Sequence, residues 1–151
     1  MVMGFRNGSN PVVSFGEAML RLTPPRYERL ERTASLDISP GGAELNSAVT
    51  VAALGVPARW VSVLPDNPLG RNLARTALAH GVDLSGVRWV PEDAGRMGLY
   101  FLEEGTDPRP SAVTYDRADS VFARMAPGTF DWPALLAGAG ALHVSGITPA
   151  V

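Results

Sequence analysis

The sequence predicts an α/β fold in which helices cover a mostly parallel sheet. Two short apolar runs, residues 12–15 (VVSF) and 58–64 (ARWVSVL), are typical of buried strands. Each run precedes a segment with helical features, at residues 43–55 and 66–81. Strands and helices that alternate at this spacing indicate parallel strands joined by crossover helices. The length of 151 residues fits one domain of average size or part of a larger one.

The first apolar run is expected to open the core. Gly16 interrupts it before MLRL (19–22) continues, which suits a buried strand that ends in a bend. The next stretch, residues 23–39, is charged and contains two adjacent prolines. Its LDIS segment alternates in polarity like an edge strand or a flap. We therefore expect residues 23–39 to lie at the periphery.

The two helical segments show their own start and stop signals. In the first, apolar residues at i, i+3, i+4 and i+7 share one face, namely Leu45, Ala48, Val49 and Ala52. Gly55 follows where a C-terminal helix glycine belongs. In the second, Asn67 is expected to be the N-cap, Pro68 occupies the first helical position, and Gly81 marks the end.

The second half of the chain departs from this alternation. Residues 97–103 (MGLYFLE) and 112–117 (AVTYDR) have the composition of strands, and a loop rich in glycine and proline separates them. We expect an antiparallel hairpin that is an appendage to the parallel sheet. Asp131 then caps a short helix, and residues 141–146 (ALHVSG) form another buried strand. Because a parallel sheet normally continues through a crossover helix after such a strand, we expect the chain to be cut in mid-fold.

The composition excludes several classes of protein. The chain has 13 arginines, no lysine and a formal net charge of −2, so we expect no basic surface for a nucleic acid backbone. Without cysteine it has no disulfides or thiolate metal sites, and without lysine it lacks the phosphate-binding lysine of a P-loop or a protein kinase. Its two histidines exclude multi-histidine metal sites, although oxygen-ligated Mg remains possible. No apolar stretch reaches the ~18 residues of a membrane span, and we expect a cytoplasmic protein.

The diglycine of Gly41 and Gly42 runs directly into the first helix, whose first turn contains Glu44 and Asn46. Glycines allow a ligand to approach the backbone, and the unpaired N–H groups of a helix start donate to hydroxyls or anions. This arrangement predicts a binding surface; the alternative is a tight turn into a buried helix, with Asn46 capping locally.

Glu17 stands where the first strand ends. Ligands of open α/β sheets bind at this end of the strands, and a carboxylate there suits sugar hydroxyls. Its alternative is a solvated carboxylate at a turn.

The predicted hairpin places three polar side chains together. Tyr115 and Arg117 are two residues apart and face the same way, and Tyr100 can join them from the partner strand. Two phenols and a guanidinium form a cup for a polar ligand, and the guanidinium favours an acidic one. The alternative is an exposed strand face with ordinary cross-strand pairs.

Three segments together resemble the amino-terminal half of the ribokinase-like, PfkB-type carbohydrate kinases: FGE at 15–17, GGAELNSAVTVAALG at 41–55 and DNPLG at 66–70. The similarity spans nearly all of the chain from Val12 onward. It implies a three-layer α/β/α domain with a small β lid, whose strands are expected around residues 30–39 and 97–117. Within the family, further segments most resemble the 2-keto-3-deoxygluconate kinases: GLY at 98–100, TYDR at 114–117 and LHVSGITPA at 142–150.

The resemblance implies a set of substrate-binding residues. One group is expected to contact the sugar acid from the start of the first helix: Gly42, Ala43, Glu44 and Asn46. Gly41 is assigned with them because it belongs to the same diglycine. A second group closes over the sugar from the lid: Tyr100, Tyr115 and Arg117. Ile147 is expected to line the pocket. Glu17 is assigned to the substrate from its place at the end of the first strand and not from the resemblance. Two positions depart from the family pattern and bear on the sugar preference, since Pro65 replaces a glycine and Asp116 an aromatic residue.

The family's second signature, a DTxGAGD-like segment, supplies the catalytic base and the anion hole, and nearby elements build the ATP site. Residues 1–151 contain no such segment, so no catalytic residue is assigned in this chain. The resemblance implies that the full-length protein phosphorylates 2-keto-3-deoxygluconate or a related sugar with ATP and Mg. We expect the isolated chain to be inactive, with at most weak sugar affinity and without good binding of ATP or Mg.

The resemblance also implies a homodimer, because lid strands of this family often pair between subunits. Two alternatives for the function stay open. One is a non-catalytic sugar-binding or regulatory module that uses the same lid and diglycine loop. The other is a different PfkB-type kinase, such as a fructokinase, a ribokinase or a nucleoside kinase.

Overall fold

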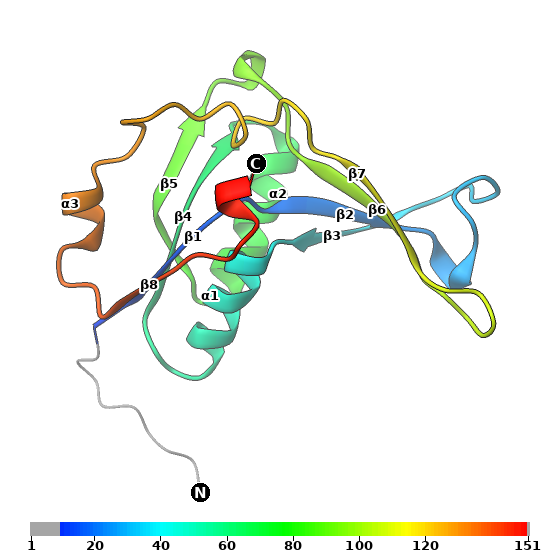
Figure 1. The fold of residues 1–151 in the computed structure, drawn as a ribbon, viewed down its shortest axis with the longest axis horizontal. Helices are drawn as coiled ribbons and strands as arrows, with labels where there is room; N and C mark the ends of the chain where they lie inside the picture. Colours follow the sequence, from blue (N-terminus) through cyan, green and yellow to red (C-terminus); the bar gives the residue numbers. More distant parts are fainter. Residues whose placement is uncertain (1–9, 151) are drawn as a thin grey trace, which may run out of the picture.

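The computed structural model describes residues 10–150, which form two four-stranded sheets (Figure 1). Sheet A has the strand order β5 (Asp83–Val90), β4 (Ala58–Pro65), β1 (Val12–Phe15), β8 (Ala141–His143). Sheet B has the order β3 (Asp37–Gly41), β2 (Met19–Thr23), β6 (Leu99–Glu103), β7 (Ala112–Asp116). Sheet A and its helices form a body, and sheet B projects from it as an arm (Figure 1).

Sheet A is parallel throughout: β1 pairs with β4 and with β8, and β4 pairs with β5. Three α-helices accompany it: α1 (Ala43–Ala53), α2 (Pro68–Ala79) and the short α3 (Trp132–Leu136). The predicted α/β class and both long helices are confirmed. Within residues 10–150, no helix is long and apolar enough to cross a membrane.

The ends of the two long helices follow the predicted signals. The Oδ1 atom of Asn67 accepts hydrogen bonds from the N–H groups of Leu69 and Gly70 at 3.1 and 3.0 Å, which satisfies two free donors of the first turn of α2. After α1, Gly55 has a φ of +81°, in the left-handed region that favours glycine. Because α1 leads into the start of β4, its own N-terminus lies at the opposite edge of sheet A, where the strands end.

The main core lies between sheet A and the two long helices. Trp60 and Leu64 point from one face of β4 into a cluster that includes Leu45 of α1 and Leu73 of α2. All four side chains are almost completely buried. Burial of each large apolar side chain contributes about 1.5–3 kcal/mol, so this cluster fixes α1 and α2 on the same face of sheet A.

The opposite face of sheet A carries an aromatic cluster instead of a long helix. The ring of Phe15 lies 5.6 Å from that of Phe122, 5.7 Å from that of Phe130 and 4.8 Å from that of Trp132. Phe122 and Phe130 belong to the irregular segment between β7 and α3, and Trp132 begins α3. This segment therefore runs across the face that α1 and α2 leave open (Figure 1).

Three strands differ from expectation. The buried strand expected at residues 141–146 is shorter and more exposed, because β8 covers Ala141–His143 at the edge of sheet A and Leu142 is 48% exposed. Residues 19–22 do not continue the first core strand; they belong to β2, which pairs with β3 and β6 in sheet B. The break falls at Gly16, where a Cβ atom would overlap the Glu44 carboxyl group, so the chain turns there and crosses to the other sheet. No strand was predicted at residues 83–90, where the structure has β5. A Cβ on Gly86 would lie 2.8 Å from Cγ2 of Val61, so glycine permits the close pairing of β4 and β5 there.

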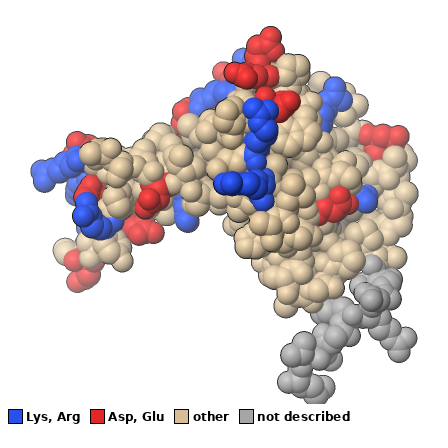
Figure 2. All heavy atoms as spheres, turned by 180° about the vertical axis from the view of Figure 1, so that it is seen from behind, with Lys and Arg blue, Asp and Glu red and all other residues tan. Residues whose placement is uncertain are grey.

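The arm corresponds to the β lid that the resemblance implies, but its strands have different bounds from those expected. The antiparallel hairpin of β6 and β7 is confirmed, but it belongs to sheet B, with β6 parallel to β2, and does not append to sheet A. Of the expected strand at 30–39, only the end is part of β3, and residues 30–36 contain no strand. Charged side chains of both signs gather at the far end of the arm (Figure 2).

Candidate functional site

The strand ends of sheet A and the N-terminus of α1 meet at one edge of the body. Glu17 follows the end of β1, and Ile147 lies in the turn after β8. Because β1 and β8 are parallel neighbours, residues that follow them reach the same edge. Gly42, the N-cap of α1, lies against this edge, since a Cβ on it would be 2.7 Å from the carbonyl oxygen of Glu17.

The two glycines at the start of α1 allow two close approaches. Besides the contact of Gly42 with the backbone at Glu17, a Cβ on Gly41 would overlap the hydroxyl group of Tyr100. The predicted diglycine thus lies between the body and the lid. The first turn of α1 exposes Ala43 and Asn46, as a ligand surface requires. Gly42 supplies no side-chain cap, which leaves N–H donors of the first turn for a ligand.

Glu44 has a different environment from its neighbours on α1. It is 2% exposed, and its Oε1 accepts hydrogen bonds from the N–H of Ser145 at 2.9 Å and from the hydroxyls of Ser145 and Thr148 at 2.6 and 2.7 Å. Burial raises the pKa of the Glu44 carboxyl, but these hydrogen bonds outweigh burial and hold the pKa below its ordinary value of 4.5. Glu44 therefore ties α1 to the turn that carries Ile147, which is 47% exposed.

Glu17 and Arg117 form an ion pair between the body and the lid. The Nη2 group of Arg117 donates to Oε2 of Glu17, and the hydroxyl of Ser120 donates to Oε1 at 2.5 Å. The side chain of Glu17 is 4% exposed and that of Arg117 is 19% exposed. The carboxylate of Glu17 is thus enclosed, while part of the guanidinium remains accessible.

The lid presents the predicted aromatic pair. Tyr100 of β6 stands opposite Tyr115 of β7 in the strand register, and the two ring centroids are 5.9 Å apart. Arg21 of β2 pairs with Tyr100 and therefore lies on the same face of sheet B. Gly41 of β3 lies on this face as well, because of the β2–β3 register and the alternation of side chains along each strand. Tyr115 is 60% exposed. This face of the lid therefore joins the start of α1 through Tyr100 and Gly41.

Asp116, one of the two departures from the family pattern, lies on the opposite face of β7 from Tyr115. Arg96 donates to its two carboxylate oxygens at 2.6 and 2.5 Å and to its backbone carbonyl at 3.0 Å. The hydrogen bonds from the Arg96 guanidinium hold the pKa of the Asp116 carboxyl below its usual range. Asp116 thus secures the base of the lid and does not face the aromatic pair.

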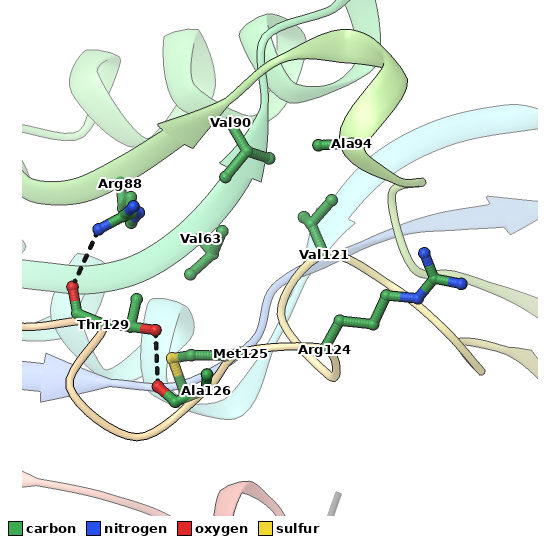
Figure 3. A pocket seen from close by; sticks show the side chains of 9 residues that line it. All are labelled: Val63, Arg88, Val90, Ala94, Val121, Arg124, Met125, Ala126 and Thr129. Atoms are coloured by element: carbon green, nitrogen blue, oxygen red, sulfur yellow. Dashed lines mark hydrogen bonds between the residues drawn. The ribbon is translucent and has the colours of Figure 1, made fainter.

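The hollow in Figure 3 lies on the face of sheet A that α1 and α2 do not cover. It has a volume of about 270 Å³, and Val63 of β4, Arg88 and Val90 of β5, and Val121 contribute to its walls. Arg88 donates to the backbone carbonyl of Thr129 at 3.2 Å. None of the predicted substrate-binding residues lines this hollow.

Within residues 10–150, no group of three or more His, Asp or Glu side chains lies together in a way that could hold a metal ion.

Three partners at the edge were not predicted from the sequence: Ser120, Ser145 and Thr148. Each is a hydroxyl residue in an irregular segment, where no periodic pattern distinguishes it, and its role appears only through a carboxylate about 100 positions away.

Comparison with known proteins places the whole described chain in one group. The family model described as pfkB family carbohydrate kinase matches residues 9–151. The 2-dehydro-3-deoxygalactonokinase of Haloferax volcanii is 44% identical over 140 residues, which are 93% of this chain and 43% of that protein. The 2-dehydro-3-deoxygluconokinase of Bacillus subtilis is 31% identical over 140 residues, which are 92% of this chain and 42% of that protein.

A solved structure shows the same fold. The 2-dehydro-3-deoxygluconokinase of Thermotoga maritima superposes with a TM-score of 0.89 at 44% identity, covering 93% of this chain and 42% of that one. The chain thus spans less than half the length of the relatives that it matches.

Proposed function

This chain belongs to the pfkB family of carbohydrate kinases, and on that premise we propose that the full-length protein phosphorylates a sugar acid. The acceptor is a hydroxyl of 2-keto-3-deoxygluconate or a related sugar, and ATP with Mg is the phosphoryl donor. Residues 1–151 supply the sugar-binding half. Relatives named for 2-dehydro-3-deoxy sugar acids support this substrate class.

The placement of Arg117 is the observation that carries the proposal. A guanidinium recognises a carboxylate by paired hydrogen bonds, and Arg117 lies between the lid and the carboxyl edge of sheet A. Tyr100 and Tyr115 supply phenol hydroxyls on the lid side, and the N–H groups after Gly42 supply donors on the body side. Together these groups offer a sugar acid contacts from two directions.

The chemistry of the family is in-line phosphoryl transfer, which requires the sugar hydroxyl, a base and the bound phosphate to be held together. The residues of this chain bind and orient the sugar. We assign no residue of this part of the protein to Mg or ATP. The family's catalytic base is likewise not assigned here.

A neutral sugar is the second candidate substrate. Glu17 cancels the charge of Arg117, which weakens the electrostatic case for an acid, and a rice fructokinase is 40% identical over 109 residues of the chain. A non-catalytic sugar-binding module remains the alternative outside the enzymes.

A homodimer through the lid completes the proposal. Tyr115 and Val113 are exposed and alternate onto the same face of β7. Pairing of two lids would remove these apolar groups from water. Sedimentation of the full-length protein is expected to give a dimer, and replacement of Val113 by Glu is expected to shift it toward the monomer.

The test is ATP-dependent turnover by the full-length protein with 2-keto-3-deoxygluconate, fructose, ribose and adenosine. We expect the highest kcat/KM with the sugar acid. A preference for fructose would select the fructokinase alternative. Binding of a sugar by calorimetry without turnover would select the non-catalytic module.

A further inference from the structure

We infer that Glu17 does not bind the sugar directly and instead acts as the counter-ion of Arg117, which it orients and whose attraction for an acidic substrate it weakens. Glu17 is therefore a positioning and specificity residue. The inference rests on the proposed function, because it concerns how strongly the same site selects acids over neutral sugars.

Both carboxylate oxygens of Glu17 already have partners, and the side chain is almost completely buried. Oε2 accepts from Arg117 and Oε1 accepts from the Ser120 hydroxyl at 2.5 Å. The backbone of Gly98 lies close to the carboxylate on another side, since a Cβ on this glycine would be 2.7 Å from Oε1 of Glu17. With only 4% of the side chain exposed, a sugar hydroxyl would have to displace one of these partners.

Ser120 is itself held in place, which makes the arrangement rigid. It is 1% exposed, its hydroxyl accepts from the N–H of Ala123 at 3.1 Å, and its N–H donates to the carbonyl of Arg117 at 3.2 Å. The segment after β7 thus fixes both the backbone of Arg117 and the hydroxyl that orients Glu17. Glu17 in turn fixes the direction of the guanidinium.

The guanidinium keeps donors for a second acceptor. Arg117 has five N–H groups, and within residues 10–150 the Nη2 group is the one with a hydrogen-bond partner. The remaining N–H groups can therefore donate to the carboxylate of a sugar acid while Nη2 keeps its hydrogen bond to Glu17. A lysine ammonium carries all of its donors on one nitrogen, so it cannot present separate N–H groups to two carboxylates as the planar guanidinium does.

Two carboxylates that share one guanidinium repel each other. At a partly buried site this repulsion is only partly screened. The negative charge of Glu17 therefore reduces the affinity of Arg117 for an acid, while a neutral sugar is unaffected. Without Glu17, the guanidinium would attract acids more strongly but would lose the partner that directs it.

The decisive variant is Glu17→Gln in the full-length protein, which keeps an acceptor oxygen for Arg117 and removes the charge. We expect the dissociation constant for 2-keto-3-deoxygluconate, measured by calorimetry, to fall by about three- to tenfold. The dissociation constant for fructose should stay within about twofold, since a neutral sugar is not repelled by the charge of Glu17. Glu92→Gln, which removes an exposed carboxylate from the turn after β5, is the matched control and should change neither value.

A second variant, Arg117→Lys, keeps the charge and tests the shared guanidinium. It should weaken binding of the acid by roughly tenfold or more, because the ammonium lacks the separate, planar donors of the guanidinium. Equal weakening of acid and fructose by Glu17→Gln would show a direct sugar ligand and overturn the inference. No change in either sugar, or full acid affinity in Arg117→Lys, would overturn it as well. Wild-type turnover with the acid tests the proposed function separately, since it does not depend on these comparisons.

Discussion

Arg117 donates a hydrogen bond to the carboxylate of Glu17, which stands 100 positions earlier in the chain. The two residues belong to different parts of the molecule, because Glu17 follows β1 of the body and Arg117 follows β7 of the lid. Their ion pair brings the lid to the edge of sheet A at which α1 begins. The position of the lid relative to the body is therefore coupled to the charge of this site.

Replacement of Gly42 by alanine tests the contact between α1 and the carboxyl edge. The φ of 169° at Gly42 is extended, so any residue can adopt it, but the new Cβ would lie 2.7 Å from the carbonyl oxygen of Glu17. We expect a loss of about 1–3 kcal/mol in the free energy of unfolding, together with weaker sugar binding. Urea unfolding measures the first and calorimetry the second. Gly146→Ala is the control, since a Cβ there meets nothing within 4 Å; equal destabilisation by both changes would contradict the close approach.

The stability of the protein should depend on the ionisation of Glu44. Its pKa is lowered in the folded state, so its carboxylate contributes stability at neutral pH that is lost as the pH falls below 4.5. Glu44→Gln should therefore destabilise the protein by about 1–3 kcal/mol at neutral pH, and the difference from wild type should shrink as the pH is lowered through this range. Urea unfolding at several pH values measures it. A difference that is constant with pH would show that the charge of Glu44 plays no part.

Tyr115 should matter for the ligand and not for the fold. The side chain is 60% exposed, so Tyr115→Ala should change the free energy of unfolding by less than about 0.5 kcal/mol. Loss of its phenol from the lid face should weaken sugar binding by roughly tenfold. Leu78→Ala, at an exposed apolar position on α2, should leave sugar binding unchanged. Unaltered sugar affinity in the Tyr115 variant would remove this residue from the site.

Asp116 should not influence the choice of sugar, although it departs from the family pattern. Its carboxylate is held by Arg96 on the face of β7 opposite to Tyr115. We expect Asp116→Ala to leave the ratio of kcat/KM values for 2-keto-3-deoxygluconate and fructose unchanged. A clear shift in this ratio would show that Asp116 reaches the ligand.

Local patterns in the sequence predicted most of the helices and strands, but they did not predict all of the strand pairings. The apolar spacing around Leu45 and the cap at Asn67 determine α1 and α2 within a single segment, and both helices are confirmed. The assignment of residues 19–22 to sheet B depends on pairing with β6, about 80 positions later, and no local signal contains it. Strand β5 was not predicted either, and its pairing with β4, which includes Val61 opposite Gly86, depends on the tertiary fold.

The same limit applies to the site. The cross-strand pair of Tyr100 and Tyr115 follows from the period of a hairpin, and it is confirmed. The hydroxyl of Ser120 reaches Glu17 only because the segment after β7 returns to the body, and this depends on the tertiary fold. Residue types and spacing therefore predicted which side chains gather on the lid, whereas the partners of the buried carboxylates required the structure.

The most direct test of the account compares wild type with Arg117→Ala in the full-length protein, by the dissociation constants for 2-keto-3-deoxygluconate and fructose. Loss of charge-assisted hydrogen bonds should weaken binding of the acid by roughly ten- to a hundredfold and that of fructose far less. Arg75→Ala, at an exposed position on α2, is the matched control and should change neither constant. Equal losses for the two sugars in the Arg117 variant would contradict the claim that this guanidinium selects a sugar acid.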